Sequence, residues 1–320
     1  MQYGFSIKRK CYLLSVLLMT VWLTGCVQEE FESTPSPAGN GIRFTLTVPD
    51  VNLPSVSSRT MTGTGTAKKE DEIETVDILV FDMSKTPAVF LEWASATEVT
   101  QDLADNSTVS FSAVLSPTTA STCIVVVANK ELDGIVSGFT KGVTTKVRAM
   151  EEMLHTQTGK WLADGSTTGG YTRIPMYGEK VISKITPSMN PITDINMKRM
   201  LARIDIRNNS VTSNFTVEEV YLANYNTTGY IAPAWNTNGQ VTEPAPDTPV
   251  LPTGSGKMTE EGNAILYSVN GNTPYDGEIY TFESLAAGDA GGAGQDGEAS
   301  RKDATCLIVK GRIGTGESTF

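Results

Sequence analysis

Side chains suited to acid–base or nucleophilic catalysis are scarce in this sequence. Its 320 residues contain one histidine, His155, and four cysteines beside 36 aspartates and glutamates. A Ser-His-Asp site could only use His155, and no Gly-x-Ser-x-Gly turn accompanies it. Zinc sites usually need several His or Cys ligands, and the sequence has no His-Glu-x-x-His segment or Asp-x-Asp-x-Asp-Gly calcium loop. Paired carboxylates remain an alternative without a local pattern, so we predict no enzyme and no metal site.

Two glycine-rich stretches could be mistaken for nucleotide-binding loops. Residues 292–297 fit the pattern Gly-x-Gly-x-x-Gly. A phosphate site of this kind needs a strand before the loop and a helix after it, and no helical pattern follows. Residues 63–68 lack the spacing of a P-loop. We therefore expect no nucleotide and no other cofactor.

The clearest chemical motif is a cysteine near the N-terminus. A basic segment, residues 8–10, precedes an apolar run over residues 11–25. The run is shorter than the ~20 residues of a membrane-spanning helix, so it predicts a signal peptide over residues 1–25. It ends in Leu23-Thr24-Gly25-Cys26, which resembles the bacterial lipobox. The Cys26 thiol would first take a diacylglycerol. Signal peptidase would then cut between Gly25 and Cys26, and the freed amine of Cys26 would be acylated by a fatty acid such as palmitate.

Two or more acyl chains hold a protein stably on a membrane, so the motif predicts a lipoprotein. The alternatives are an uncleaved anchor helix and a cysteine that follows an ordinary signal peptide by chance. Residues 26–40 form an acidic tether, which resembles the surface-export signals of some Gram-negative lipoproteins or is a solvated linker. The formal net charge of −11 and the pI of 4.7 argue against nucleic acid as a partner, because phosphate binding needs clustered Lys and Arg.

The elements that position these groups are expected to be strands. Short apolar runs separated by Gly, Pro, Asn and Ser predict an all-β fold of antiparallel sandwiches. In the first run Ile42, Phe44, Leu46 and Val48 alternate with polar residues, which predicts a half-buried strand. We expect further strands at 73–81, 108–115, 122–128, 176–185, 200–206, 215–222 with a bulge at 218–219, 264–269, 279–282 and 305–313.

One segment has helical periodicity. Val147, Met150, Met153 and Leu154 recur at helical spacing, which predicts a short helix over 144–156 with Thr144 or Thr145 as N-cap. We expect His155 on the surface near the C-terminal end of this helix, where the partial negative charge favours it.

The polar stretch 208–214 is the best boundary between two domains. We expect an N-terminal β-sandwich over 41–208 and a C-terminal one over 209–320. The first would include a strand at 41–49 and a flexible loop at 50–70.

This loop suggests a way to remove the first strand. It is rich in Ser, Thr and Gly, it contains Arg59, and loops of small polar residues are where proteases cut. A cut between Arg59 and Thr60 would detach the strand, whose four apolar side chains contribute about 6–12 kcal/mol at ~1.5–3 kcal/mol each. That is comparable with the ~5–15 kcal/mol stability of a whole domain. The domain would therefore accept a strand from another subunit by β-strand addition. The alternative is that Arg59 is an ordinary surface residue.

The order of these features resembles the fimbrillin family, the type V pilins of Bacteroidales-type bacteria. The matching stretches are 23–26, 58–60, 77–82, 124–129, 174–178, 199–204, 279–284 and 306–311. The resemblance implies two transthyretin-like β-sandwich domains. It also implies export as a surface-exposed lipoprotein of the cell outer membrane, held by the lipid on Cys26. An arginine-specific protease would then cut between Arg59 and Thr60, and subunits would join by strand exchange into a fimbrium for adhesion.

One departure from that family lies at the C-terminal end. We expect further strands after 305–313 in the family, including an aromatic strand and a late Arg-Asn segment. The sequence reaches Phe320 without them. The second sandwich is therefore expected to be C-terminally incomplete: either the chain is a fragment or it cannot donate a strand in the usual way.

A different class of function is kept as the alternative. A surface lipoprotein could bind glycans or host proteins without polymerising, and Trp93, Trp161 and Trp235 could stack on sugars. We favour partly buried structural roles for these three side chains. Cys123 and Cys306 lie in apolar strands of different expected domains, which favours free thiols over a bridge.

Overall fold

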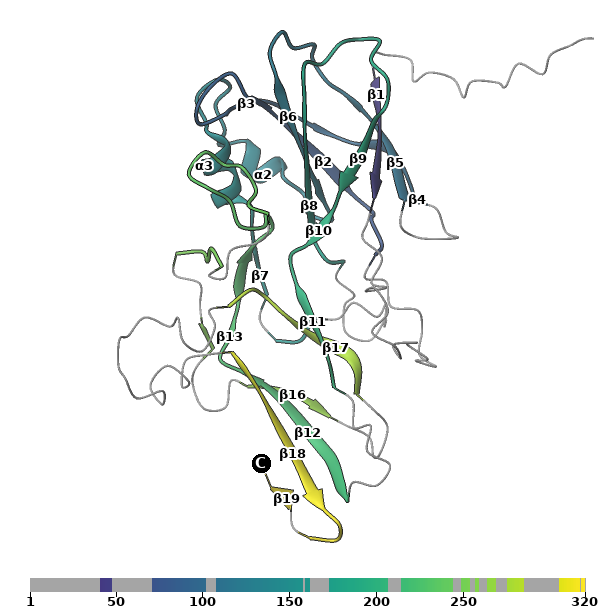
Figure 1. Ribbon diagram of the computed structural model, residues 1–320, viewed down its shortest axis with the longest axis vertical. Helices are drawn as coiled ribbons and strands as arrows, with labels where there is room; N and C mark the ends of the chain where they lie inside the picture. Colours follow the sequence, from purple (N-terminus) through teal and green to yellow (C-terminus); the bar gives the residue numbers. More distant parts are fainter. Residues whose placement is uncertain are drawn as a thin grey trace, which may run out of the picture. The chain divides into compact units, whose positions relative to one another are not determined.

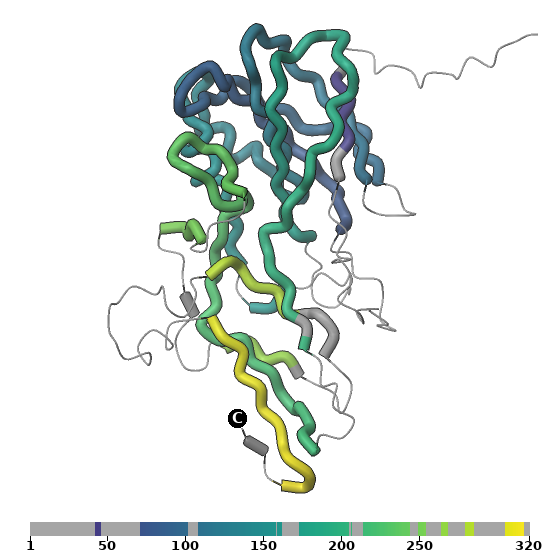
Figure 2. Tube along the Cα trace, viewed as in Figure 1, coloured from purple at the N-terminus to yellow at the C-terminus, as the bar shows by residue number. Residues whose placement is uncertain are grey.

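The computed structural model places its described residues, apart from Gly41, in one compact unit, Ile42–Phe320. It describes residues 41–47, 71–101, 108–157, 159–161, 173–206, 214–243, 249–253, 257–258, 264–268, 275–284, 305–316 and 318–319 (Figure 1, Figure 2). These residues are mostly in β-strands, so the all-β prediction is confirmed.

Two sheets form a β-sandwich in the N-terminal half of this unit (Figure 1). The first has the order β4-β5-β1-β9, with β1 at Gly41–Thr47, β4 at Thr97–Gln101, β5 at Thr108–Val114 and β9 at Ile192–Asn196. The second has the order β10-β8-β6-β2-β3, with β2 at Val76–Asp82, β3 at Val89–Ser95, β6 at Thr122–Ala128, β8 at Met176–Ile182 and β10 at Lys198–Arg199.

The second sheet is buried on both faces. Ile78 and Val80 of β2 pack into the core between the two sheets, whereas Leu79 and Phe81 face a second core on the other side. Strand β6 is buried along its whole length. This double burial explains why β2 and β6 have continuous apolar sequences instead of alternating ones.

Two helices contribute to the second core, α2 at Asp133–Val136 and α3 at Lys146–Glu152. Thr145 is the N-cap of α3, as expected, and its side chain accepts a hydrogen bond from the Arg148 backbone N–H. The helix ends at Glu152 and not at residue 156. Leu154–Thr156 instead form strand β7, because their backbone pairs with β14, Thr228–Tyr230.

This pairing corrects the prediction for His155. The residue lies in strand β7, beyond the end of α3, and its ring centroid lies 5.0 Å from that of Trp161. Both ring nitrogens are buried without a hydrogen-bond partner among the described residues. The helical periodicity failed here because an apolar residue such as Leu154 suits a strand equally well.

A third core lies among the later strands. It is formed by Val220, Leu222, Tyr225, Tyr267 and Ile279. The sheet β16-β12-β18-β19 consists of Ile265–Ser268, Phe215–Ala223, Cys306–Ile313 and Ser318–Thr319, in that order. The remaining pairs are β11, Ala202–Ile206, with β17, Tyr275–Thr281, and β13, Tyr225–Asn226, with β15, Lys257–Met258. The register of β12 against β18 shifts between Val217 and Glu219, so the expected bulge is confirmed.

The expected domain boundary at 208–214 lies almost wholly outside the described residues. Ile231, Ala232, Tyr280 and Phe282 belong to the same core as Leu79 and other residues of the N-terminal half. Described residues from both sides of the boundary therefore share a core. The division into domains at 208–214 stays a prediction.

Candidate functional site

Strand β1 occupies an interior position in its sheet, between β5 and β9. In Figure 1 it is the purple strand beside β9. Both neighbours lie far along the chain, so no short hairpin turn links β1 to either of them. The strand is therefore held by hydrogen bonds to β5 and β9 and by its side chains.

Two of the four predicted core-face residues of β1 are seen to be buried. Ile42 is 4% exposed and Phe44 is 1% exposed, and both belong to the core between the sheets. The Phe44 ring stacks on that of Phe111 in β5, with centroids 4.9 Å apart and ring planes 5° from parallel. The Leu46 side chain and Val48 lie outside the described residues. Phe44 is therefore the most deeply buried of the described β1 side chains.

The pairing of β1 with β9 is parallel and interrupted. Phe44 pairs with Ile192 and Leu46 with Ile195, so β9 carries one extra residue in this stretch. Asp194, within it, has a φ of 59°, a left-handed conformation that Asp tolerates better than most residues. The Lys180 ammonium donates to the Thr193 carbonyl at 2.5 Å and lies 3.6 Å from the Asp194 carboxylate. These contacts from β8 fix the bulge beside the β1 position.

The predicted processing residues cannot be placed relative to this strand. Gly25, Cys26, Arg59 and Thr60 all lie outside the described residues. Of the predicted site residues, the structure brings Ile42 and Phe44 together in one core, which also contains side chains of β5 and β9. The lipid-attachment and cleavage sites stay predictions.

Sequence reasoning missed the residues that hold the segment directly before β2. Gln101, Asn129, Arg173 and Arg199 come from separate parts of the chain and converge on residues 71–75. No local motif marks them, since the contacts span up to 128 residues of sequence. One available signal is that Asn129 directly follows the long apolar strand β6.

The remaining candidate side chains are buried or partly buried. Trp161 is buried, Trp93 and Trp235 are partly buried, and Trp235 packs edge-on against Tyr230. Cys123 and Cys306 are both free thiols, as expected. Burial raises the pKa of the Cys123 thiol to about 12, so it is protonated at neutral pH.

The part of the chain that the structure describes holds neither a metal-binding cluster nor a membrane-spanning helix. There, no group of three or more His, Cys, Asp and Glu side chains could hold a metal ion. Within the same residues, no helix has the length and apolar character needed to cross a membrane.

The described fold is that of an all-β protein whose first strand is interior to a sheet and lacks a hairpin link to its neighbours. Residues 42–298 match the family described as major fimbrial subunit protein (FimA). The chain belongs to this family. Membership indicates a structural subunit of a cell-surface fimbrium.

Similar solved structures include three proteins from two bacterial species. A fimbrial assembly protein of Parabacteroides distasonis is 12% identical, over 87% of this chain and 84% of that one, with a TM-score of 0.42. A putative cell adhesion protein of the same organism is 15% identical, over 87% and 76%, with a TM-score of 0.44. A putative adhesin of Bacteroides ovatus is 14% identical, over 77% and 68%, with a TM-score of 0.33. No curated protein sequence matches the chain. Similarity at this level carries no argument about function.

Proposed function

We propose that this chain is the precursor of a fimbrial subunit that polymerises by exchanging its first strand. It is exported to the outer membrane as a lipoprotein acylated on Cys26. An arginine-specific protease then cuts between Arg59 and Thr60 and separates β1 from the rest of the chain. A strand of another subunit takes the place of β1, and the resulting fimbrium serves adhesion.

One observation carries the proposal: β1 is an interior strand with no hairpin link to either neighbour. A cut in the loop after β1 removes its covalent link to β2 while the chain between β5 and β9 stays intact. The departure of β1 would leave two facing strand edges and an exposed core. Unpaired edges of this kind are ready templates for another strand.

The buried side chains of β1 determine how much free energy the fold loses when β1 leaves, and so how strongly it favours a replacement strand. Burial of a large apolar side chain contributes ~1.5–3 kcal/mol, so Ile42 and Phe44 together contribute about 3–6 kcal/mol. That is a large part of the ~5–15 kcal/mol stability of a typical domain. When β1 has left, binding of a strand with apolar residues at alternate positions is therefore strongly favoured.

Limited digestion of the mature protein with an arginine-specific protease tests the cleavage step. We expect one dominant cut after Arg59, seen by N-terminal sequencing from Thr60, because Arg43 is fixed inside β1. Variant Arg59→Ala should resist this cut, while Arg43→Ala should be cut like the wild type. Cuts scattered over many arginines would contradict the proposal. So would a nicked protein that never exchanges β1 for an added strand.

A further inference from the structure

Two amide side chains hold the backbone directly before β2 from both edges. Gln101 accepts from the Ile73 N–H at 3.1 Å and donates to the Asp71 carbonyl at 2.7 Å. Asn129 accepts from the Glu74 N–H at 3.0 Å and donates to the Glu72 carbonyl at 2.8 Å. Gln101 thus binds residues 71 and 73, and Asn129 binds residues 72 and 74. This is the alternating pattern with which neighbouring strands would pair.

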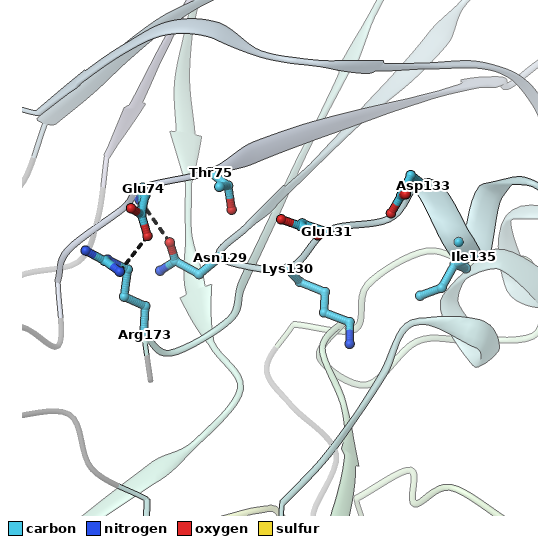
Figure 3. Close-up of a pocket in the computed structure, with 9 residues that line it drawn as sticks. Glu74, Thr75, Asn129, Lys130, Glu131, Asp133, Ile135 and Arg173 are labelled. Atoms are coloured by element: carbon cyan, nitrogen blue, oxygen red, sulfur yellow. Dashed lines mark hydrogen bonds and ion pairs between the residues drawn. The ribbon is translucent and has the colours of Figure 1, made fainter. Parts of the chain in front are cut away.

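Two arginines add charge to these contacts. Arg173 lies 3.2 Å from the Glu72 carboxylate and 2.5 Å from that of Glu74, and Arg199 pairs with Asp71. Figure 3 shows Arg173 and Asn129 meeting at Glu74, at one side of an open cavity of about 540 Å³. We call the side chains of Gln101, Asn129, Arg173 and Arg199, with residues 71–75, the 71–75 clamp.

The clamp joins the two sheets of the sandwich. Gln101 is the last residue of β4, in the sheet that contains β1. Asn129 directly follows β6, and Arg199 belongs to β10, both in the other sheet. Ile73, at the centre of the clamped segment, is buried in the same core as Ile42 and Phe44. None of the contacts that define the clamp involves a residue of β1.

We propose that the 71–75 clamp keeps the pair β4–β5 in place after β1 leaves, so that the position between β5 and β9 stays open for a replacement strand. Without β1, the hydrogen-bonded link from β5 across the sheet to β9 is lost. Gln101 still ties β4, and through it β5, to the segment before β2. A site that is already formed binds faster and more tightly, because fewer residues must be ordered on binding. This inference rests on the proposed function.

The test uses the full chain with a specific protease site inserted within residues 50–70, so that it does not depend on cleavage at Arg59. After cutting, β1 is removed by gel filtration in mild urea. The association rate of a labelled peptide of residues 41–48 is then measured.

The variants are Gln101→Ala, the milder Gln101→Glu, and Asn129→Gly, which keeps the left-handed backbone of Asn129 at φ 58°. Gln240→Ala is the control, since the Gln240 side chain bonds only to Asn236 among the described contacts.

We expect the three clamp variants to bind the peptide about tenfold more slowly than the wild type, and Gln240→Ala to bind at the wild-type rate. In the emptied clamp variants, the amides of β5 should lose protection from hydrogen exchange, whereas before cutting they should stay protected. Wild-type rates and protection in all clamp variants would overturn the inference and leave strand exchange standing. Failure of the emptied wild type to bind the peptide, with its β5 amides still protected, would instead contradict the proposed function.

Discussion

At the residue scale, the most deeply buried charge among the described residues is that of Lys146. Its side chain is 1% exposed, and its ammonium lies 2.6 Å from the Glu179 carboxylate, which also accepts a hydrogen bond from Tyr177 at 2.5 Å. Burial, followed by the nearby Glu179 charge, raises the pKa of Tyr177 well above its usual value. The hydroxyl therefore stays protonated and keeps donating to Glu179.

Removing one partner of this pair should cost more than removing both charges. We expect Lys146→Met to lower the free energy of unfolding by about 3 kcal/mol, because Glu179 would keep a poorly solvated charge. Lys146→Met with Glu179→Gln should recover part of that loss, since the amide still accepts from Tyr177. Urea denaturation of the four proteins in the cycle measures the coupling. A loss in the double variant equal to the sum of the losses in the two single variants would show that the charges are not coupled.

His155 should make the fold sensitive to acid. Burial, and secondarily the charge of Lys130, lowers the pKa of His155 to about 4 from 6.5. The unfolded chain then binds the proton at higher pH than the folded chain. The stability contributed by the neutral ring is therefore complete above about pH 6.5 and is lost as the pH falls towards 4.

The variant His155→Phe, which keeps an aromatic ring beside Trp161 and Phe282, tests this contribution. We expect its Tm to fall less than that of the wild type between about pH 7 and pH 4.5. Lys130→Gln should raise the pKa of His155 and reduce the same loss by a smaller amount. Parallel Tm profiles of His155→Phe and the wild type would assign the acid sensitivity to the carboxylates.

At the scale of the element, the aromatic residue of β1 should decide which strands can replace it. Phe44 lies flat on Phe111 in the core, so a peptide of residues 41–48 with Phe44→Ala should bind the emptied body about 100-fold more weakly. A peptide with Arg43→Ala should bind nearly as well as the wild type, because Arg43 is exposed. Fluorescence anisotropy with the labelled peptides gives both affinities. Equal affinities for the Phe44→Ala and wild-type peptides would show that the core contact does not select the strand.

The same scale shows which elements the sequence could predict. Continuous apolar runs predicted β2 and β6, and alternation of apolar and polar residues predicted the burial of Ile42 and Phe44. These predictions need only the sequence of the strand itself, because the pattern of apolar residues within a strand shows which faces are buried. Strands β3, β4 and β9 were not expected. In β4 and β9 most positions are polar; β4 is held by pairing with the next strand, β5, and β9 by pairing with β1, which lies far away along the chain. The clamp was missed for the same reason: Asp71 and Arg199 are adjacent only after both sheets have formed.

At the scale of the whole molecule, the proposed lipid on Cys26 should anchor the precursor to the membrane. Variant Cys26→Ser cannot take a diacylglycerol, so we expect it to lose the labelled fatty acid that the wild type incorporates in growing cells. Cys123→Ser should leave this labelling unchanged, because Cys123 is buried in β6. Labelling of Cys26→Ser equal to that of the wild type would contradict lipid attachment at this cysteine.

The interior position of β1 also has a mechanical consequence. A strand bound on both edges and pulled along its own axis loads the hydrogen bonds of both edges at once, whereas a strand peeled from one end breaks them in turn. A replacement strand between β5 and β9 would meet tension along a fibre in the first way. An aromatic residue at the Phe44 position would add resistance to sliding. Its ring, stacked on Phe111, must break that contact before the strand can shift by one residue. A joint of this geometry resists shear without any covalent bond between subunits.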